Sequence, residues 1–272
     1  MDRDSLILMK HRTLACTAVT AVFLMALSPA ANAAPSPRTF TTRDTSSLPV
    51  VYLSGANDVA LLNSDVKKNI TAAGMQFFEW DPLKTSLKES PTLYDHMDAY
   101  AESVDAFVKS VLKKTGAKKV NIITYSQSGL INQSWMKNHG GAQYVAKVIN
   151  YSGLLQGSPF GAIATNFTGN CLGFGTCVDF DPWGPVVTRL NENGEALAGI
   201  IYYNLTSKYD EMAMPYQINF MYSPTGNYKN VLLQDYYPAE RAGHLMVPHA
   251  KSTKTLTIQM LKGLPLTALL KK

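Results

Sequence analysis

The chain has 272 residues, of which 46% are hydrophobic and 17% are charged. A chain of this composition can bury a sizeable core, which excludes an intrinsically disordered protein. The net charge is +5, but the 25 basic and 20 acidic residues are interspersed without a long Lys/Arg run, so we expect no nucleic-acid partner. Three cysteines are too few for a disulfide framework or a structural zinc module.

Residues 1–33 are typical of a signal peptide. A basic stretch at 10–12 precedes an uncharged apolar run over 13–27, and Ala31-Asn-Ala33 follows as a small-x-small cleavage site. The apolar run has about 15 residues, fewer than the ~20 that a spanning helix needs. We therefore expect removal of this segment and secretion to the extracellular space, with a retained membrane anchor as the alternative.

Two cysteines, Cys171 and Cys177, lie beyond the signal peptide. Export places them in an oxidising compartment, where a close pair usually forms a disulfide. The loop that they would close is short, so the bond would fix a local loop and add little to overall stability. Two unpaired buried thiols are the alternative.

The next segments alternate between strand and helix patterns after a flexible Pro/Ser/Thr-rich leader at 34–47. The clearest helix has apolar residues at intervals of three and four and ends at Lys113, Lys114 and Gly116, as helix C-termini favour. The predicted strands are 48–53, 75–80, 120–124 and 145–151, and the predicted helices are 58–73, 94–115 and 127–138. This alternation predicts an α/β fold with a mostly parallel central sheet and helices on both faces.

Residues 152–185 interrupt the alternation with a glycine- and aromatic-rich stretch that lacks a periodic apolar pattern. We interpret it as a loop-rich insertion over one edge of the sheet, because irregular stretches of that length usually serve as lids or binding loops. The predicted elements beyond it are a helix at 186–199, strands at 200–206, 217–222 and 230–235, and a last helix at 251–262. The whole of 48–272 is expected to form one catalytic domain.

Ser126 lies on the turn between the strand 120–124 and the helix that follows it. A serine on so tight a turn projects its Oγ out of the sheet at a helix N-terminus, which is how a hydrolase presents its nucleophile. Thr124 and Ser128 occupy positions where this turn usually has glycine, and both side chains are small enough to fit. The alternative is an ordinary serine at a helix cap.

An acid and a histidine follow Ser126 in the chain order that such a hydrolase requires. Asp210 lies in the loop after the strand 200–206, and His244 lies in the loop after the last predicted strand. His249 is the competing base, because His96 precedes the serine and His139 lies at the end of its helix.

We favour His244 on two grounds. Gly243 would let the backbone turn the imidazole towards the serine. His249 would begin a helix, whose positive end disfavours an imidazolium.

The segment Thr-Tyr-Ser-Gln-Ser-Gly at 124–129 resembles the Thr-Trp-Ser-Gln-Gly-Gly turn of α/β-hydrolase lipases of the Candida antarctica lipase B type. Tyr209-Asp-Glu-Met-Ala-Met-Pro215 resembles their Asp-Glu-x-x-x-Pro segment, and Gly-His-Leu at 243–245 resembles the class 2 bacterial lipases. The resemblance implies the α/β-hydrolase fold, a Ser–Asp–His triad, hydrolysis of carboxylic esters and no cofactor or metal. It also implies an oxyanion hole made by the backbone N–H groups of Gln127 and Ala56.

Apolar residues flank the candidate site and predict a hydrophobic groove for an acyl chain. They are Phe160, Phe167, Leu172, Phe174 and Trp183 in the insertion, and Leu245, Met246 and Val247 after the histidine. The alternative is that these aromatics only pack the insertion onto the domain. We expect an ester or lipid substrate, transient contact with a lipid interface, and a monomer.

Two other functions stay open. Ala56 stands where the lipases have a threonine, and the glycines usual at 124 and 128 are missing, which favours a secreted binding protein on an inactive hydrolase scaffold. An acyltransferase or polyester depolymerase would use the same three residues, because water and alcohols enter the same site.

Overall fold

The computed structural model describes residues 39–55, 60–81, 95–168 and 175–268, which form the compact unit that begins at Thr39. Within them, one sheet has the strand order β2-β1-β3-β4-β5-β6, and every neighbouring pair is parallel. The strands are β1 (Val50–Leu53), β2 (Phe77–Trp80), β3 (Val120–Tyr125), β4 (Val145–Tyr151), β5 (Ile201–Thr206) and β6 (Asn227–Leu232). The α/β class and the parallel sheet predicted from the sequence are confirmed.

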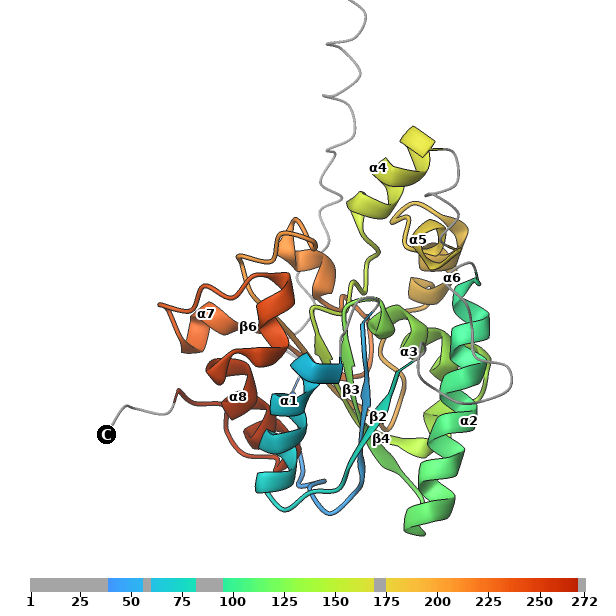
Figure 1. Cartoon of the computed structure of the whole chain (residues 1–272). Coiled ribbons are helices and arrows are strands. Elements are labelled where there is room, and N and C mark those ends of the chain that lie inside the picture. The colour runs from blue at the N-terminus through green and yellow to red at the C-terminus, as the bar shows by residue number, and fades with distance from the viewer. Residues whose placement is uncertain (1–38, 56–59, 82–94, 169–174, 269–272) are drawn as a thin grey trace, which may run out of the picture. The chain divides into compact units, whose positions relative to one another are not determined.

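Helices cover both faces of this sheet (Figure 1). On one face lie α2 (Met97–Thr115), α3 (Ser128–Asn138) and α6 (Pro185–Asn191), and on the other lie α1 (Ala60–Ala72) and α8 (Lys251–Leu261). The shorter elements are α4 (Pro159–Thr168), α5 (Gly175–Asp179) and α7 (Leu233–Tyr236), with single 3₁₀ turns η2 (Gly141–Tyr144), η4 (Tyr216–Asn219) and η5 (His244–His249).

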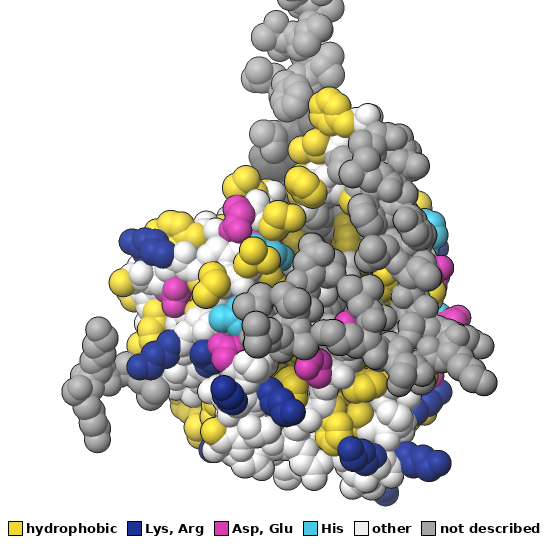
Figure 2. All heavy atoms as spheres, in the orientation of Figure 1, with side chains coloured by type: hydrophobic (Ala, Val, Ile, Leu, Met, Phe, Trp, Pro, Cys, Tyr) yellow, Lys and Arg dark blue, Asp and Glu magenta, His cyan; other side chains and the backbone are white. Residues whose placement is uncertain are grey.

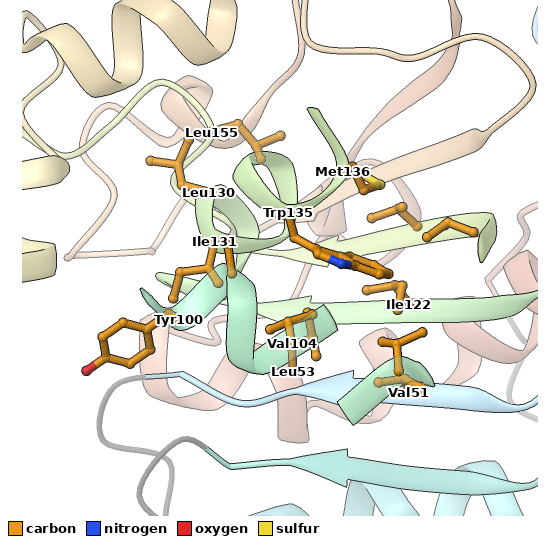
Figure 3. Close-up of a cluster of buried hydrophobic side chains, with 14 of the residues drawn as sticks. Val51, Leu53, Tyr100, Val104, Ile122, Leu130, Ile131, Trp135, Met136 and Leu155 are labelled. Atoms are coloured by element: carbon orange, nitrogen blue, oxygen red, sulfur yellow. The ribbon is translucent and has the colours of Figure 1, made fainter. Parts of the chain in front are cut away.

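The core on the α2–α3 face is built from the periodic apolar positions of these helices. Figure 3 shows Val104 of α2 and Trp135 of α3 against Leu53 and Ile122 of the sheet, and all four side chains are fully buried. Burying a side chain of this size contributes about 1.5–3 kcal/mol. Gly116 then ends α2 in the left-handed conformation (φ 71°), and its N–H bonds to the Leu112 carbonyl.

The chain order reverses between β1 and β3, which is a position where α/β sheets commonly bind ligands. From β1 the chain runs outward to β2, and it then crosses back to β3 on the other side of β1. At such a reversal, the loops that leave the carboxyl ends of the two strands diverge and leave room for a ligand. Ser54 and Gly55 follow β1 and Ser126 follows β3, so the candidate nucleophile lies at this point.

The described part of the predicted leader, residues 39–47, is packed against the domain. Thr45 is buried, and its backbone N–H donates to the Leu261 carbonyl at 2.9 Å. The Lys147 ammonium donates to the Arg43 carbonyl at 2.9 Å and also to the Met260 carbonyl at the end of α8. The folded unit therefore begins before residue 48.

The strand predicted at 217–222 is wrong. This segment forms η4 and then irregular chain, because its polar groups bond to side chains rather than to a neighbouring strand. Asn219 is buried, where it donates to Thr206 Oγ1 and accepts from the Leu154 N–H, both at 2.9 Å. The backbone of Met221 pairs with the side-chain amide of Asn230 through both its N–H and its carbonyl.

Three further boundaries differ from the sequence predictions. The helix expected over 186–199 ends at Asn191, because Asn193 and Gly194 turn the chain with positive φ angles of 62° and 91°. The last strand ends at Leu232, and the residues after it form the helical turn α7. The insertion at 152–185 carries α4 and α5 and is less irregular than expected.

Candidate active site

Ser126 occupies a strained turn between β3 and α3. Its φ angle is 56°, in the left-handed region that costs a non-glycine residue about 1–3 kcal/mol. The turn is held by a bond from the Ser126 N–H to the Tyr151 carbonyl at 3.0 Å. The first turn of α3 lies so close to the loop after β4 that a Cβ on Gly129 would be 2.1 Å from the Gly153 oxygen. This packing exposes the Ser126 side chain while its neighbours are buried.

Thr124 and Ser128, which replace the usual glycines, are fully buried and hydrogen-bonded. Thr124 Oγ1 donates to Asn150 Oδ1 at 2.6 Å. Ser128 Oγ accepts from the Tyr125 N–H at 2.8 Å and lies 2.6 Å from the Leu53 carbonyl, to which it donates. Both hydroxyls thus tie the turn to neighbouring strands, so the departures from the usual pattern are accommodated by specific bonds.

The Thr124 bond is the first in a row of side-chain bonds that crosses four strands. Asn150 donates to Asn204 at 2.8 Å, and Asn204 donates to Asn230 at 2.8 Å. Asn230 in turn donates to the Met221 carbonyl at 3.0 Å. Thr124, Asn150, Asn204 and Asn230 stand opposite one another in the strand register, so this row of hydrogen-bonded side chains, buried except for the partly exposed Asn230, aligns β3 to β6 near their carboxyl ends.

The structure brings Ser126, His244 and Asp210 together in one hydrogen-bonded series. His244 Nε2 lies 2.9 Å from Ser126 Oγ, and His244 Nδ1 lies 2.8 Å and 3.0 Å from the two carboxylate oxygens of Asp210. Asp210 and His244 are buried, whereas Ser126 is partly exposed. We call these three residues the candidate triad. An imidazole placed between a buried carboxylate and an accessible hydroxyl can accept the hydroxyl proton.

The loop after β5 holds the Asp210 carboxylate in place. Its Oδ1 accepts from the N–H groups of Met212 at 3.1 Å and Ala213 at 2.9 Å. Gln234 of α7 binds the same loop through the Lys208 N–H at 3.0 Å and binds the Glu240 carbonyl at 3.1 Å. Gln234 therefore links the loop of the acid to the loop of the histidine, which sequence reasoning did not anticipate.

Gly243 has a different role from the one predicted. Its φ angle is −78°, a backbone conformation that any residue can adopt, so the turn does not need glycine. Instead, a Cβ at this position would lie 2.4 Å from Glu211 Oε2, which accepts from the His244 N–H at 2.8 Å. Glycine here therefore leaves the space in which the Glu211 carboxylate binds the His244 N–H, and a Cβ would displace that carboxylate.

The other described histidines pair with carboxylates elsewhere. His249 ends η5 and does not begin a helix as predicted, and its Nδ1 is 2.8 Å from Asp65 Oδ1. His96 Nδ1 is 3.0 Å from Asp179, and His139 Nε2 is 3.5 Å from Asp98.

Two predicted site features fall partly outside the described residues. Gln127 is the N-cap residue of α3, directly after Ser126, so its backbone N–H is next to the nucleophile. Ala56, the second predicted oxyanion donor, lies outside the described residues, as does Cys171. Cys177 lies on α5 and is disulfide-bonded, but its partner lies outside the described residues, so the pairing with Cys171 stays a prediction.

Apolar side chains are exposed on the segments that follow the carboxyl ends of β4, β5 and β6, and Figure 2 shows hydrophobic side chains gathered on α4 and beside it. We call this set the apolar rim. It consists of Phe160, Ile163, Phe167, Trp183, Met212, Met214, Leu245 and Met246, which are 39–87% exposed. Phe160, Phe167 and Trp183 are thus not buried packing residues of the insertion, whereas Phe180 is buried in the core on the α2–α3 face. Val247 was predicted in the groove but is buried in the core on the α8 face. Leu172 and Phe174 lie outside the described residues.

Among the described residues, no three His, Cys, Asp or Glu side chains are grouped closely enough to hold a metal ion. Within the same ranges, no helix combines the length and the apolar character needed to cross a bilayer.

No family model matches the chain, but solved structures match most of its length. Lipase B of Aspergillus fumigatus superposes with a TM-score of 0.63 at 14% identity, over 84% of this chain and 56% of that one. Lipase BlEst2 of Bacillus licheniformis in its mature form superposes with a TM-score of 0.56 at 15% identity, over 82% of this chain and 94% of that one. A bromoperoxidase of Bacillus anthracis gives 0.53 at 13% identity, over 80% and 93%.

This chain thus spans little more than half the length of the Aspergillus lipase. At identities of 13–15%, the likeness concerns the fold, and one fold can carry several chemistries. The six parallel strands and the strained serine turn after β3 agree with the folds of these neighbours. The chain therefore has the α/β-hydrolase fold.

Proposed function

We propose that this chain is a secreted hydrolase of carboxylic esters that forms an acyl-enzyme on Ser126. The observation that carries the proposal is the candidate triad, in which every contact from Asp210 through His244 to Ser126 is 3.0 Å or shorter. The names of two fold neighbours, both lipases, agree with it. The signal-peptide pattern at 1–33 supports secretion.

In the first half of the reaction, Ser126 Oγ attacks the ester carbonyl carbon while its proton passes to His244 Nε2. Asp210 accepts the Nδ1–H bond, which keeps the imidazole in the tautomer that leaves Nε2 free to accept. The same carboxylate stabilises the imidazolium that forms. Because Asp210 is buried, water weakens this interaction little.

The attack converts the carbonyl oxygen into an oxyanion, which needs hydrogen-bond donors fixed in advance. The Gln127 N–H is in position to be one, because it directly follows the nucleophile at the N-terminus of α3. The resemblance to the lipases proposes the Ala56 N–H as the second. Losing one such donor costs about a hundredfold or more in rate.

In the second half, His244 returns its proton to the departing alcohol, and the acyl group stays on Ser126. Water then attacks the acyl carbon while His244 accepts its proton. That proton passes to Ser126 Oγ as the bond to the acyl group breaks and the carboxylic acid leaves. The reaction needs no redox step, and every proton taken by His244 is given back within the cycle.

The apolar rim supports a substrate with a long acyl chain, such as an acylglycerol. It surrounds the loops of the candidate triad, and Met212 and Leu245 lie within two residues of Asp210 and His244. The α4 helix, which carries three rim residues, contains no charged residue. Exposed apolar groups of this kind suit transient contact with a lipid surface as well as with an acyl chain.

The test is the hydrolysis of p-nitrophenyl esters from acetate to palmitate by the mature chain, with Ser126→Ala as the matched control. We expect wild-type turnover that increases towards longer chains, and a Ser126→Ala rate near that of the buffer. A wild-type chain that hydrolyses none of these esters would overturn the proposal and favour a binding protein on an inactive scaffold. Product analysis with an added alcohol or a polyester separates acyltransfer and polyester cleavage from simple ester hydrolysis.

A further inference from the structure

The main chain of His244 is hydrogen-bonded on both sides by side chains outside the candidate triad. Glu211 Oε2 accepts from the His244 N–H at 2.8 Å, and the Tyr125 hydroxyl donates to the His244 carbonyl at 3.1 Å. The Tyr125 ring also lies against the imidazole, with 5.3 Å between ring centroids and 34° between ring planes. Both peptide groups of the histidine are thus bound to named side chains.

The two contacts come from the segments that carry the other members of the triad. Glu211 directly follows Asp210, and Tyr125 directly precedes Ser126. Each segment therefore supplies one side chain to the imidazole and one to the histidine backbone. Gly243 leaves the space for Glu211, since a Cβ there would lie 2.4 Å from its Oε2.

We infer that Glu211 and Tyr125 are positioning residues that fix the backbone of His244 so that its ring meets Asp210 and Ser126 together. The segment before His244 is irregular from the end of α7 at Tyr236 to the start of η5 at His244. Hydrogen bonds to both peptide groups of His244 fix its backbone where regular secondary structure before it does not. A displacement of a catalytic side chain by about 1 Å already lowers the rate strongly. Anchoring the backbone of His244 should therefore have a large effect on rate. This inference rests on the proposed function.

The first experiment measures kcat and KM for a soluble p-nitrophenyl ester, with kcat expressed per serine titrated by a fluorophosphonate. We expect Glu211→Ala and Tyr125→Phe each to lower kcat by about 10- to 100-fold and to change KM by less than about twofold, because neither touches substrate. Glu211→Gln should recover most of the loss, since its amide oxygen accepts the same bond.

Gly243→Ala should reproduce the Glu211→Ala loss by pushing the carboxylate away. The double variant Glu211→Ala/Gly243→Ala should then lose no more than either single variant, as expected for two residues that act through one contact.

The matched controls are Glu102→Ala, which removes an exposed carboxylate from α2, and Tyr203→Phe, which removes a buried hydroxyl from β5. Both should keep the wild-type kcat per titrated serine. A purely structural role of Glu211 and Tyr125 would lower the melting temperature and the number of titratable serines but would leave this kcat unchanged. That result would overturn the inference, and so would a Glu211→Gln variant as slow as Glu211→Ala.

A second measurement does not depend on ester hydrolysis. Hydrogen exchange of the His244 amide, followed by NMR, should be about tenfold faster or more in Glu211→Ala than in the wild type and in Glu211→Gln. Unchanged exchange would overturn the contact itself. If the wild type hydrolyses no ester, the proposed function fails on that result, and the exchange rates still decide whether Glu211 anchors His244.

Discussion

The imidazole of His249 is paired with Asp65, at 2.8 Å between Nδ1 and Oδ1, and therefore belongs to the packing of η5 against α1. Asp65 also accepts from the Lys254 ammonium of α8 at 2.8 Å. One carboxylate thus joins three elements. The histidine that competes with His244 in the sequence has a structural partner of its own, which separates the two candidates.

Replacing each histidine with alanine tests this assignment. His244→Ala should lower kcat by several orders of magnitude, because His244 Nε2 is the group that is hydrogen-bonded to Ser126 Oγ and can accept its proton. His249→Ala should keep most of the turnover and lose some stability with its Asp65 contact. Measuring kcat of both purified variants on one ester decides which histidine is the base. A lower kcat in His249→Ala than in His244→Ala would refute the role of His244.

The pH dependence of stability should reflect Asp65. Burial acts to raise the pKa of Asp65, but the hydrogen bonds from Lys254 and His249 outweigh it and hold the pKa below its ordinary value of 3.8. A carboxyl whose pKa is lowered by folding adds stability above its unfolded pKa and loses it as the pH falls through the folded value.

Near neutral pH, Asp65→Asn should therefore be less stable than the wild type by about 1 kcal/mol, since the pair is partly exposed. The difference should shrink as the pH falls below about 4. Urea unfolding of both proteins across this range measures it, and a difference that is independent of pH would contradict the account.

Ser128 and Ser126 should respond to alanine substitution in opposite ways. Ser128→Ala leaves the buried Tyr125 N–H and Leu53 carbonyl without their partner and should destabilise the chain by about 1–3 kcal/mol. Its turnover per folded molecule should stay within about tenfold of the wild type. Ser126→Ala should fold as well as the wild type and be inactive. An inactive Ser128→Ala beside an active Ser126→Ala would show that the nucleophile is misassigned.

The predicted bond between Cys171 and Cys177 is tested by thiol titration of the mature chain under denaturing, non-reducing conditions. We expect no free thiol. Reduction should change substrate preference more than melting temperature, because the closed loop is short and Cys177 lies on α5, which contacts α4 and its rim residues. Two titratable cysteines in the unreduced protein would rule the bond out.

The order of the elements and the grouping of Ser126, Asp210 and His244 could be predicted, because both leave a pattern in the sequence. Periodic apolar positions identify α2, and the chain order of serine, acid and histidine after successive strands selects Asp210 and His244. Where short-range pattern and tertiary contacts disagree, the prediction fails. Residues 217–222 were predicted as a strand, but the partly buried side chain of Asn230 binds the backbone of Met221, and the buried side chain of Asn219 binds Thr206 and the Leu154 N–H.

Glu211, Gln234 and the amides of Asn150 and Asn204 were not predicted for a related reason. Each acts through contacts with residues distant in the chain, such as the His244 N–H for Glu211. Composition and spacing carry no trace of such contacts. Gly243 shows the same limit, since its glycine is explained by the space that Glu211 occupies and not by the turn.

The most direct test of the central claim is to treat the mature chain with a fluorophosphonate and to map the adduct by mass spectrometry. The account predicts a single phosphonylated serine, Ser126, with labelling slower by several orders of magnitude in His244→Ala, because the reaction needs both the partly exposed hydroxyl and its base. A wild-type chain that stays unlabelled, or that carries the adduct on another serine, would contradict it.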